Sequence, residues 1–330
     1  MKTELIAFTD AGEALARRLA DALGGTASRC GRPEPLSVWA GRCFANAQAL
    51  IFVGAAGIAV RAIAPHLRGK AFDPAVIVMD ECGQFAVPIL SGHLGGANDL
   101  ARRIAALTGA VPVLTTATDT NGVFAADSWA KGQGCAVANP EDIKNVSAAL
   151  LSGGTVTLRS PWPVAGSPPK GVVLTAEGPC DLALTVTRAE PNILQLVPRI
   201  AVLGVGCRQN ISAEAIEEAY RVYLAENNVW EQAVYKVCSI DRKADEPGLR
   251  AFCAAHGLPL ETFSAGHLRS VPGSFSASSF VEQTVGVDNV CERAAVLGSG
   301  GTLYRKKAAG NGVTMALALS PFTPDWRWMV

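Results

Sequence analysis

The chain has 330 residues, of which 49% are hydrophobic and 18% charged, with 29 basic and 29 acidic side chains. This length predicts two or three domains, and the composition is typical of a folded α/β enzyme rather than of a coiled coil or a disordered chain. A formal net charge of zero, without a long basic run, argues against a nucleic-acid or anionic-membrane partner.

The amino terminus carries only the short apolar run LIAF, too short for the core of a signal peptide, and no stretch has the length of a membrane span. We therefore expect a cytoplasmic protein without a membrane partner. The nine cysteines are scattered, and no two form a Cys-x-x-Cys pair. Buried, reduced thiols are expected, and structural zinc is not.

Strand and helix patterns alternate over the first 122 residues. Continuous apolar runs such as Ala49–Gly54 indicate strands buried on both faces of a sheet. The helix after Gly96 is predicted to bury Leu100, Ile104 and Leu107. We expect strands at 4–9, 49–54, 75–80, 84–90 and 111–115, with helices after Asp10, over 58–67 and after Gly96. This alternation predicts an α/β fold with a doubly wound N-terminal sheet domain.

The pattern changes after residue 122. Residues 123–198 are predicted to form a small middle module and a connector, with a helix at 139–151 and short strands near 155–158 and 172–174. Residues 199–330 resume the alternation, with strands at 200–206, 234–240 and 313–319 and helices after Ser212, at 247–256 and at 289–297. Three domains are therefore predicted, at 1–122, 123–198 and 199–330, and the last is a second α/β domain.

The loop between residues 90 and 97 combines glycines with polar side chains. Glycines permit positive φ and close approach of a ligand, and amides at a helix start suit a carboxylate or phosphate. A histidine side chain can serve as an acid or a base in catalysis, so His93 is a candidate for either role. The alternative is a tight turn in which Ser91 and Asn98 cap the helix. The functional interpretation assigns catalysis to Ser91 and His93 and ligand binding to Gly92, Gly95, Gly96 and Asn98.

A second polar loop follows the strand at 111–115. In a parallel sheet it would lie beside the first loop, at the carboxyl edge where ligands usually bind. Thr115 and Thr116 are candidate binding residues, and Asp119 is a candidate carboxylate base or partner of a ligand hydroxyl. An Asx turn or a helix cap would explain Asp119 equally well.

Two further glycine turns are candidate binding sites. Gly54 and Gly57 precede Arg61, whose guanidinium would clamp a substrate carboxylate, although a solvated surface arginine is the alternative. A turn at 204–208 resembles half of a dinucleotide fingerprint. Gln209 stands in place of the third glycine and no Walker lysine follows, so the pattern is a weak indication of NAD or ATP.

Other catalytic signatures are missing from the sequence. No Gly-x-Ser-x-Gly elbow occurs, so an α/β-hydrolase serine triad is not predicted. Cys207, beside Arg208, is more simply interpreted as a buried thiol than as a nucleophile. Residue chemistry alone predicts a ligand-handling α/β protein with acid/base groups and anion-binding turns.

Six segments carry a family resemblance: 54–61 (GAAGIAVR), 88–98 (PILSGHLGGAN), 115–119 (TTATD), 124–130 (FAADSWA), 204–208 (GVGCR) and 290–295 (VCERAA). In these segments the chain resembles the CbiG family, the cobalt-precorrin-5A hydrolases of anaerobic cobalamin biosynthesis. The resemblance covers nearly the whole chain. The serine–glycine–histidine loop together with the later GVGCR segment is specific, whereas either alone would be weak.

The resemblance implies a hydrolase that opens the δ-lactone of cobalt-precorrin-5A, releases acetaldehyde and forms cobalt-precorrin-5B. From residue type and position, we expect His93 to be the general base and Asp119 to orient it or act as a second acid/base. The amides of the Gly92–Gly96 loop would suit the oxyanion. Arg61 and Arg208 would hold peripheral carboxylates of the macrocycle.

Gly204 and Gly206 are assigned to substrate binding with Arg208. Cobalt would arrive inside the substrate, so no cofactor and no protein metal site are expected. Transient contact with neighbouring pathway enzymes is the expected protein partnership. The alternatives are a non-catalytic corrinoid-binding or carrier protein and a nucleotide-dependent enzyme that uses the 204–208 turn.

Overall fold

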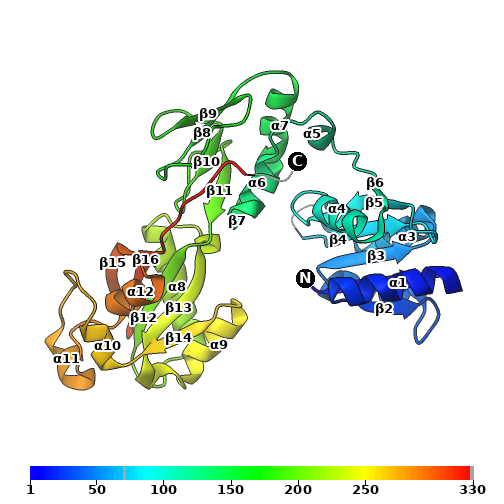
Figure 1. The fold of residues 1–330 in the computed structure, drawn as a ribbon. Helices are drawn as coiled ribbons and strands as arrows, with labels where there is room; N and C mark the ends of the chain where they lie inside the picture. Colours follow the sequence, from blue (N-terminus) through cyan, green and yellow to red (C-terminus); the bar gives the residue numbers. More distant parts are fainter. Residues whose placement is uncertain (70–71, 328–330) are drawn as a thin grey trace. The chain divides into compact units, whose positions relative to one another are not determined.

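The structure, a computed structural model, describes residues 1–69 and 72–327. They form two compact units, one of residues 1–131, 143–154 and Arg327 and the other of residues 132–142 and 155–326. The units hold three sheets flanked by helices (Figure 1), which confirms the predicted fold class. The predicted domain boundaries after residues 122 and 198 stay predictions.

A six-stranded sheet forms the centre of the first unit. Its strands are β1 (Thr3–Ala7), β2 (Thr26–Arg29), β3 (Ala49–Val53), β4 (Ala75–Met79), β5 (Phe85–Leu90) and β6 (Val111–Pro112). They lie in the order β2-β1-β3-β4-β5-β6. The first four strands run parallel, whereas β5 is antiparallel to β4 and parallel to β6. The sheet is therefore mixed rather than parallel throughout.

The reversal between β4 and β5 decides which loops share an edge. The tight turn at 81–83 joins the two strands as a hairpin, so β5 and β6 end at the edge opposite to the one where β3 ends. The loops after β5 and β6 lie at the same edge, as predicted. The turn that contains Gly54 and Gly57 follows β3 and lies at the other edge.

Helices cover both faces of this sheet, as in a doubly wound fold. α1 (Asp10–Leu23) and α4 (Ala97–Thr108) pack on one face, and α2 (Leu36–Asn46) and α3 (Ala56–Ile63) pack on the other. Alternate strand residues supply the two cores, because successive side chains of a strand point to opposite faces. The remaining short helices of this unit are η1 (Ala64–His66), α5 (Ala117–Thr120), α6 (Ala126–Gly132) and α7 (Ile143–Leu151).

The cap of α1 and the buried face of α4 can be compared with the predictions made from the sequence. Either Thr9 or Asp10 could cap α1 from the sequence, and Thr9 does so, since its Oγ1 accepts a hydrogen bond from the amide of Gly12 at 3.0 Å. In α4, Leu100 and Ile104 are buried as predicted, but Leu107 is 49% exposed, so its assignment to the core was wrong. The last turn of α4 lies beyond the edge of the apolar face.

The second unit contains two five-stranded sheets. One has the order β7-β11-β10-β8-β9 and the other the order β14-β13-β12-β16-β15. The strands of the first are β7 (Cys135–Val137), β8 (Val156–Arg159), β9 (Val172–Thr175), β10 (Leu182–Leu184) and β11 (Leu194–Pro198). Those of the second are β12 (Ala201–Cys207), β13 (Val234–Ile240), β14 (Leu260–Phe263), β15 (Thr302–Gly310) and β16 (Val313–Leu319).

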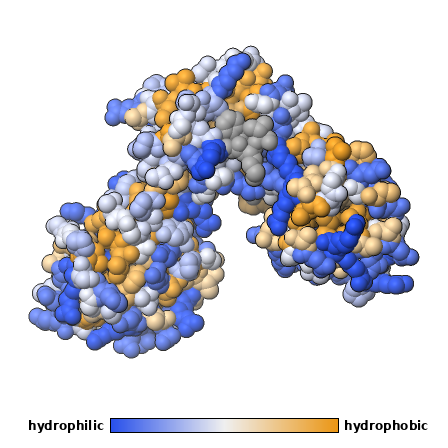
Figure 2. Space-filling view, in the orientation of Figure 1, coloured by the Kyte–Doolittle hydropathy of each residue, from blue (hydrophilic) through white to orange (hydrophobic). Residues whose placement is uncertain are grey.

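The helices of the second unit are α8 (Ala213–Glu226), α9 (Pro247–Ala255), α10 (Ala265–Arg269), α11 (Ser279–Val285) and α12 (Cys291–Ser299), with the short η2 (Pro140–Asp142), η3 (Glu231–Ala233) and η4 (Asp241–Lys243). Ser212 caps α8, as predicted, by accepting a hydrogen bond from the amide of Ala215 at 3.2 Å. On the face shown in Figure 2, hydrophilic residues cover much of both units, interrupted by apolar areas.

Strand β12 continues through the segment that was predicted to be a turn. Gly204 pairs with Cys238 on one side and with Ala316 on the other. A Cβ on Gly204 would lie 1.8 Å from the carbonyl oxygen of Cys291 at the start of α12. The glycine is therefore needed so that this helix can pack closely on the strand. The predicted turn at 204–208 was wrong, because the strand ends only at Cys207.

Candidate functional site

The loop between β5 and α4 closes on itself through three backbone hydrogen bonds. The amides of Gly96, Ala97 and Asn98 donate to the carbonyls of His93, Ser91 and Gly92, at 3.0, 3.1 and 3.0 Å. Ser91 and Gly96 have φ of 56° and 84°, in the left-handed region that favours glycine. These three amides already donate to backbone carbonyls, so the anion predicted to bind here could be held only by the amides of residues 92–95.

Asn98 joins this loop to the second polar loop. Its side chain is buried, and Nδ2 donates to Thr116 Oγ1 at 3.1 Å and to Asp119 Oδ2 at 2.8 Å. No side chain caps α4, whose N-cap residue is Gly96. The alternative in which Ser91 and Asn98 cap this helix was therefore wrong. Ser91 Oγ is buried and has no hydrogen-bond partner among the residues that the structure describes.

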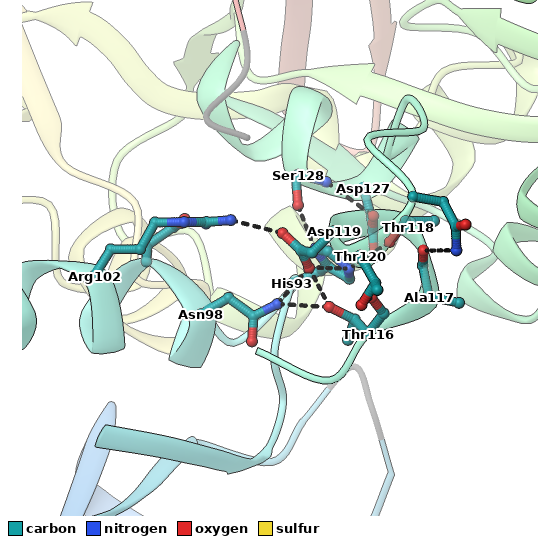
Figure 3. Close-up of polar contacts among 12 residues, drawn as sticks. His93, Asn98, Arg102, Thr116, Ala117, Thr118, Asp119, Thr120, Asp127 and Ser128 are labelled. Atoms are coloured by element: carbon teal, nitrogen blue, oxygen red, sulfur yellow. Dashed lines mark hydrogen bonds and ion pairs between the residues drawn. The ribbon is translucent and has the colours of Figure 1, made fainter. Parts of the chain in front are cut away.

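Asp119 lies at the centre of this network (Figure 3). Its Oδ1 accepts a hydrogen bond from Arg102 Nη2 at 2.7 Å, and its Oδ2 accepts from Asn98 and from Thr116 Oγ1. Burial acts to raise the pKa of Asp119, but the hydrogen bonds from Thr116 and Arg102 and the charges of His93 and Arg102 hold this pKa below its usual value. The carboxyl group is therefore ionised at neutral pH.

His93 points from the first loop into the second. Its Nε2 lies 3.0 Å from Thr118 Oγ1 and 3.4 Å from Asp119 Oδ2, and its Nδ1 lies 2.6 Å from Ser128 Oγ on α6 (Figure 3). The side chains of His93 and Asp119 are 16% and 9% exposed. The imidazole is thus held at both nitrogens beside an ionised carboxylate, an arrangement that can accept and return a proton.

Four residues of this network were missed by the sequence analysis. Arg102 was not singled out as a candidate, and Thr118 and Ser128 entered only as members of the segments 115–119 and 124–130. Lys131, on α6, lies against the first loop, since a Cβ on Gly96 would be 2.1 Å from its Nζ. Ser128 and Lys131 are three residues apart on one helix, so they lie on the same helical face. That spacing is the signal that could have identified them together.

The other predicted binding residues do not join the network. Thr115 and Arg61 are exposed, and Arg61 folds back on its own helix, because a Cβ on Gly57 would lie 3.6 Å from its guanidinium. Gly54 precedes that helix at the opposite sheet edge. In the second unit, Arg208 is exposed at the end of β12 and lies against Gly312. The binding roles of these residues, and of Gly204 and Gly206 within β12, stay predictions.

Cysteine chemistry is not favoured at Cys207. Cys207 is partly rather than fully buried, and burial raises the pKa of its thiol to about 11, so the thiol is protonated at neutral pH. Within residues 1–69 and 72–327, no three His, Cys, Asp or Glu side chains gather as metal ligands. Across the same residues, no helix is both long and apolar enough to cross a membrane.

The fold and the site define an α/β protein with a histidine–carboxylate pair held between two loops. Profiles of one family match three consecutive parts of the chain: "Cobalamin synthesis G N-terminal" at residues 38–119, "Cobalamin biosynthesis central region" at 124–192 and "Cobalamin synthesis G C-terminus" at 201–318. The chain therefore belongs to the cobalamin synthesis G (CbiG) family.

Two relatives match the sequence of this protein over most of its length. It is 34% identical to the cobalt-precorrin-5A hydrolase of Salmonella typhimurium, covering 96% of this chain and 97% of that protein. It is 32% identical to the cobalt-precorrin-5A hydrolase of Priestia megaterium, covering 84% of this chain and 80% of that protein. The solved structure of CobE, a protein from the cobalamin (vitamin B12) biosynthetic pathway, covers 38% of this chain and 94% of its own at 28% identity, with a TM-score of 0.36. The two relatives named cobalt-precorrin-5A hydrolase place the chain among the hydrolases of cobalamin biosynthesis.

Proposed function

We propose that this protein hydrolyses cobalt-precorrin-5A, opening its δ-lactone and releasing acetaldehyde to give cobalt-precorrin-5B. The observation that supports the chemistry most directly is the His93–Asp119 pair, with Nε2 and Oδ2 3.4 Å apart. Two relatives that are named cobalt-precorrin-5A hydrolase, at 34% and 32% identity, support the substrate.

Opening the lactone adds water across its acyl–oxygen bond. His93 accepts a proton from the attacking nucleophile and later returns a proton to the leaving oxygen. Asp119 stabilises the imidazolium that forms in between, and Arg102 keeps Asp119 ionised through the bond of 2.7 Å. The amides of residues 92–95 lie beside His93 and would stabilise the oxyanion at the carbonyl carbon.

Release of acetaldehyde follows from the hydroxyl group that lactone opening sets free. Loss of its proton and cleavage of the adjacent carbon–carbon bond expel the two-carbon fragment, and the electron pair left on the macrocycle takes up a proton. The same His93 imidazole can serve as base and then as acid. Cobalt is carried by the substrate in this scheme, so the reaction uses no cofactor of the protein.

Peripheral carboxylates of the macrocycle would be held by exposed arginines. Arg61 and Arg208 are the candidates, since both side chains are exposed. Transient contact with neighbouring pathway enzymes would deliver the substrate and remove the product.

The test is incubation of the purified protein with cobalt-precorrin-5A, with acetaldehyde measured by an enzymatic assay and the macrocycle by mass spectrometry. We expect stoichiometric acetaldehyde together with the corresponding change in macrocycle mass. Tight binding without acetaldehyde or a mass change would instead identify a non-catalytic corrinoid carrier. A melting temperature that rises when NAD or ATP is added would instead support the alternative of a nucleotide-dependent enzyme.

A further inference from the structure

The side chains of Ser128, His93 and Asp119 form a continuous series of polar contacts (Figure 3). Ser128 Oγ lies 2.6 Å from His93 Nδ1, and Nε2 of the same ring lies 3.4 Å from Asp119 Oδ2. We propose that Ser128 is the nucleophile of this enzyme and that it forms a transient ester with the carbonyl carbon of the lactone. The proposal rests on the proposed function and supplies the attacking atom, which that function leaves open.

The proton on the imidazole must face Asp119 for Ser128 to be activated. An ionised carboxylate can only accept hydrogen bonds, and Asp119 already accepts from Arg102 and Asn98. The neutral imidazole is therefore most stable with its proton on Nε2, directed towards Asp119 and Thr118. Nδ1 is then the basic nitrogen, and it accepts the hydrogen bond from the hydroxyl of Ser128.

This arrangement has the three roles of a serine–histidine–aspartate triad, with the two ring nitrogens exchanged relative to the usual pattern. Triads are recognised by geometry and roles rather than by sequence motif. The absence of a Gly-x-Ser-x-Gly elbow from the sequence therefore does not argue against a triad here. Ser91, the serine assigned to catalysis from the sequence, makes no hydrogen bond to His93 within the described part of the chain.

The surroundings of Ser128 suit an oxyanion. Ser128 is half-buried on α6, its amide donates to Asp127 Oδ1 at 2.9 Å, and its Oγ lies 2.6 Å from His93 Nδ1. Lys131 follows one turn later, and its ammonium lies against Gly96 in the first loop. Lys131 thus brings a positive charge to the loop that contains His93, and this charge and the amides of residues 92–95 would stabilise a tetrahedral intermediate.

The reaction balances without any further reactant. Ser128 Oγ bonds to the carbonyl carbon while its proton passes to His93 Nδ1. The acyl–oxygen bond breaks, its electron pair stays on the lactone oxygen, and that oxygen takes the proton from His93. Water then attacks the ester, His93 accepts a proton from the water and returns one to Ser128 Oγ, and the carboxylic acid leaves. One lactone and one water give one hydroxy acid.

The first measurement compares Ser128→Ala with Ser152→Ala, an exposed serine at the end of α7 in the same unit. Lactone opening is followed by mass spectrometry in single turnover with cobalt-precorrin-5A. Ser128→Ala should lower the rate about a thousandfold or more, whereas Ser152→Ala should leave it unchanged. A Ser128→Ala rate within tenfold of the wild type overturns the proposal.

The second measurement separates a nucleophile from a serine that only positions His93. A fluorophosphonate probe should label Ser128 in the folded wild-type protein, and peptide mapping after an acid quench with substrate should find the ester on Ser128. Lactone opening by a wild type that shows neither label nor ester at Ser128 overturns the proposal, even if Ser128→Ala is inactive. In that case the serine acts by positioning the imidazole.

The two proposals can fail independently. Labelling of Ser128 without any lactone opening contradicts the proposed function and supports the nucleophile. Lactone opening without labelling or ester contradicts the nucleophile and supports the function. Neither labelling nor opening overturns both.

Discussion

Two of the glycine-containing segments next to apolar strand patterns, at residues 91–96 and 204–206, serve different purposes. In the Ser91–Gly96 loop, the left-handed backbone of Ser91 and Gly96 turns the chain so that His93 reaches Asp119 and Ser128. In β12, Gly204 stays within a strand and leaves room for the carbonyl oxygen of Cys291. Glycine permits a left-handed turn in the first segment and close packing in the second.

The comparison shows which observation separates the two cases. The first segment is surrounded by polar side chains that bond to one another across two loops, and its amides at residues 92–95 donate to no backbone carbonyl among the described residues. The second is bonded on both sides by neighbouring strands. Substitutions in the first should therefore affect turnover, and substitutions in the second should affect stability.

The largest expected effect is on turnover at the first segment. His93→Ala and Asp119→Asn should each lower kcat by about a hundredfold or more, because each removes a group that handles the proton. His267→Ala, at an exposed histidine of the second unit, is the matched control and should retain the wild-type rate. Acetaldehyde release and the melting temperature are measured for all three. Near-normal rates for both His93→Ala and Asp119→Asn would reassign the loop to binding.

The next effect is on stability at β12. Gly204→Ala places a methyl group against the carbonyl of Cys291 and should cost about 1–3 kcal/mol of unfolding free energy. Gly310→Ala, in β15 of the same sheet, is the matched control, since a Cβ there meets no atom within 4 Å. Denaturant unfolding of the two variants checks this. Equal stabilities would show that α12 can shift on β12 without cost, and would remove the packing role of Gly204.

The smallest effect is a change in pH dependence. Since Arg102 helps to hold the pKa of Asp119 down, Arg102→Met should raise that pKa. Ionised Asp119 stabilises the fold above its unfolded pKa of about 3.9, and this contribution disappears as the pH falls through the folded value. In Arg102→Met, both the stability and the acid limb of kcat should therefore decline at a higher pH than in the wild type.

Arg103→Met is the control for that shift. Arg103 is the exposed neighbour of Arg102 on α4 and lies outside the network around Asp119. Its pH profile should coincide with that of the wild type. If both variants shift the acid limb equally, the effect comes from the general positive charge of α4 and not from the hydrogen bond to Asp119.

Much of the fold could be predicted from the sequence, because buried strands have a strong local pattern. The apolar runs at β3, β4 and β16 were placed within one or two residues of their observed bounds. The helix α2 and the strand β15 were missed. β15 is an edge strand that carries three consecutive basic residues, 305–307, and therefore lacks the apolar run of a buried strand.

Only part of the candidate site could be predicted from the sequence, because only part of it depends on local pattern. His93 and Asp119 lie in loops that directly follow strands, where position alone suggests function. Ser128 lies 35 residues from His93, on a short helix with no elbow motif, and its contact with the imidazole depends on tertiary packing. The turn at Gly204 was predicted wrongly because this glycine makes room for α12, a helix that lies far along the chain.

The position of α6 in the chain has a consequence for any attempt to dissect this protein. The match to the N-terminal part of the family ends at Asp119, and the match to the central region begins at residue 124, four residues before Ser128. A fragment that ends between them keeps the imidazole and its carboxylate but loses the serine and Lys131. Exchange of N-terminal parts between relatives would likewise join one protein's acid/base pair to another's serine, so such chimaeras are a direct measure of how closely the two halves of the site have been matched.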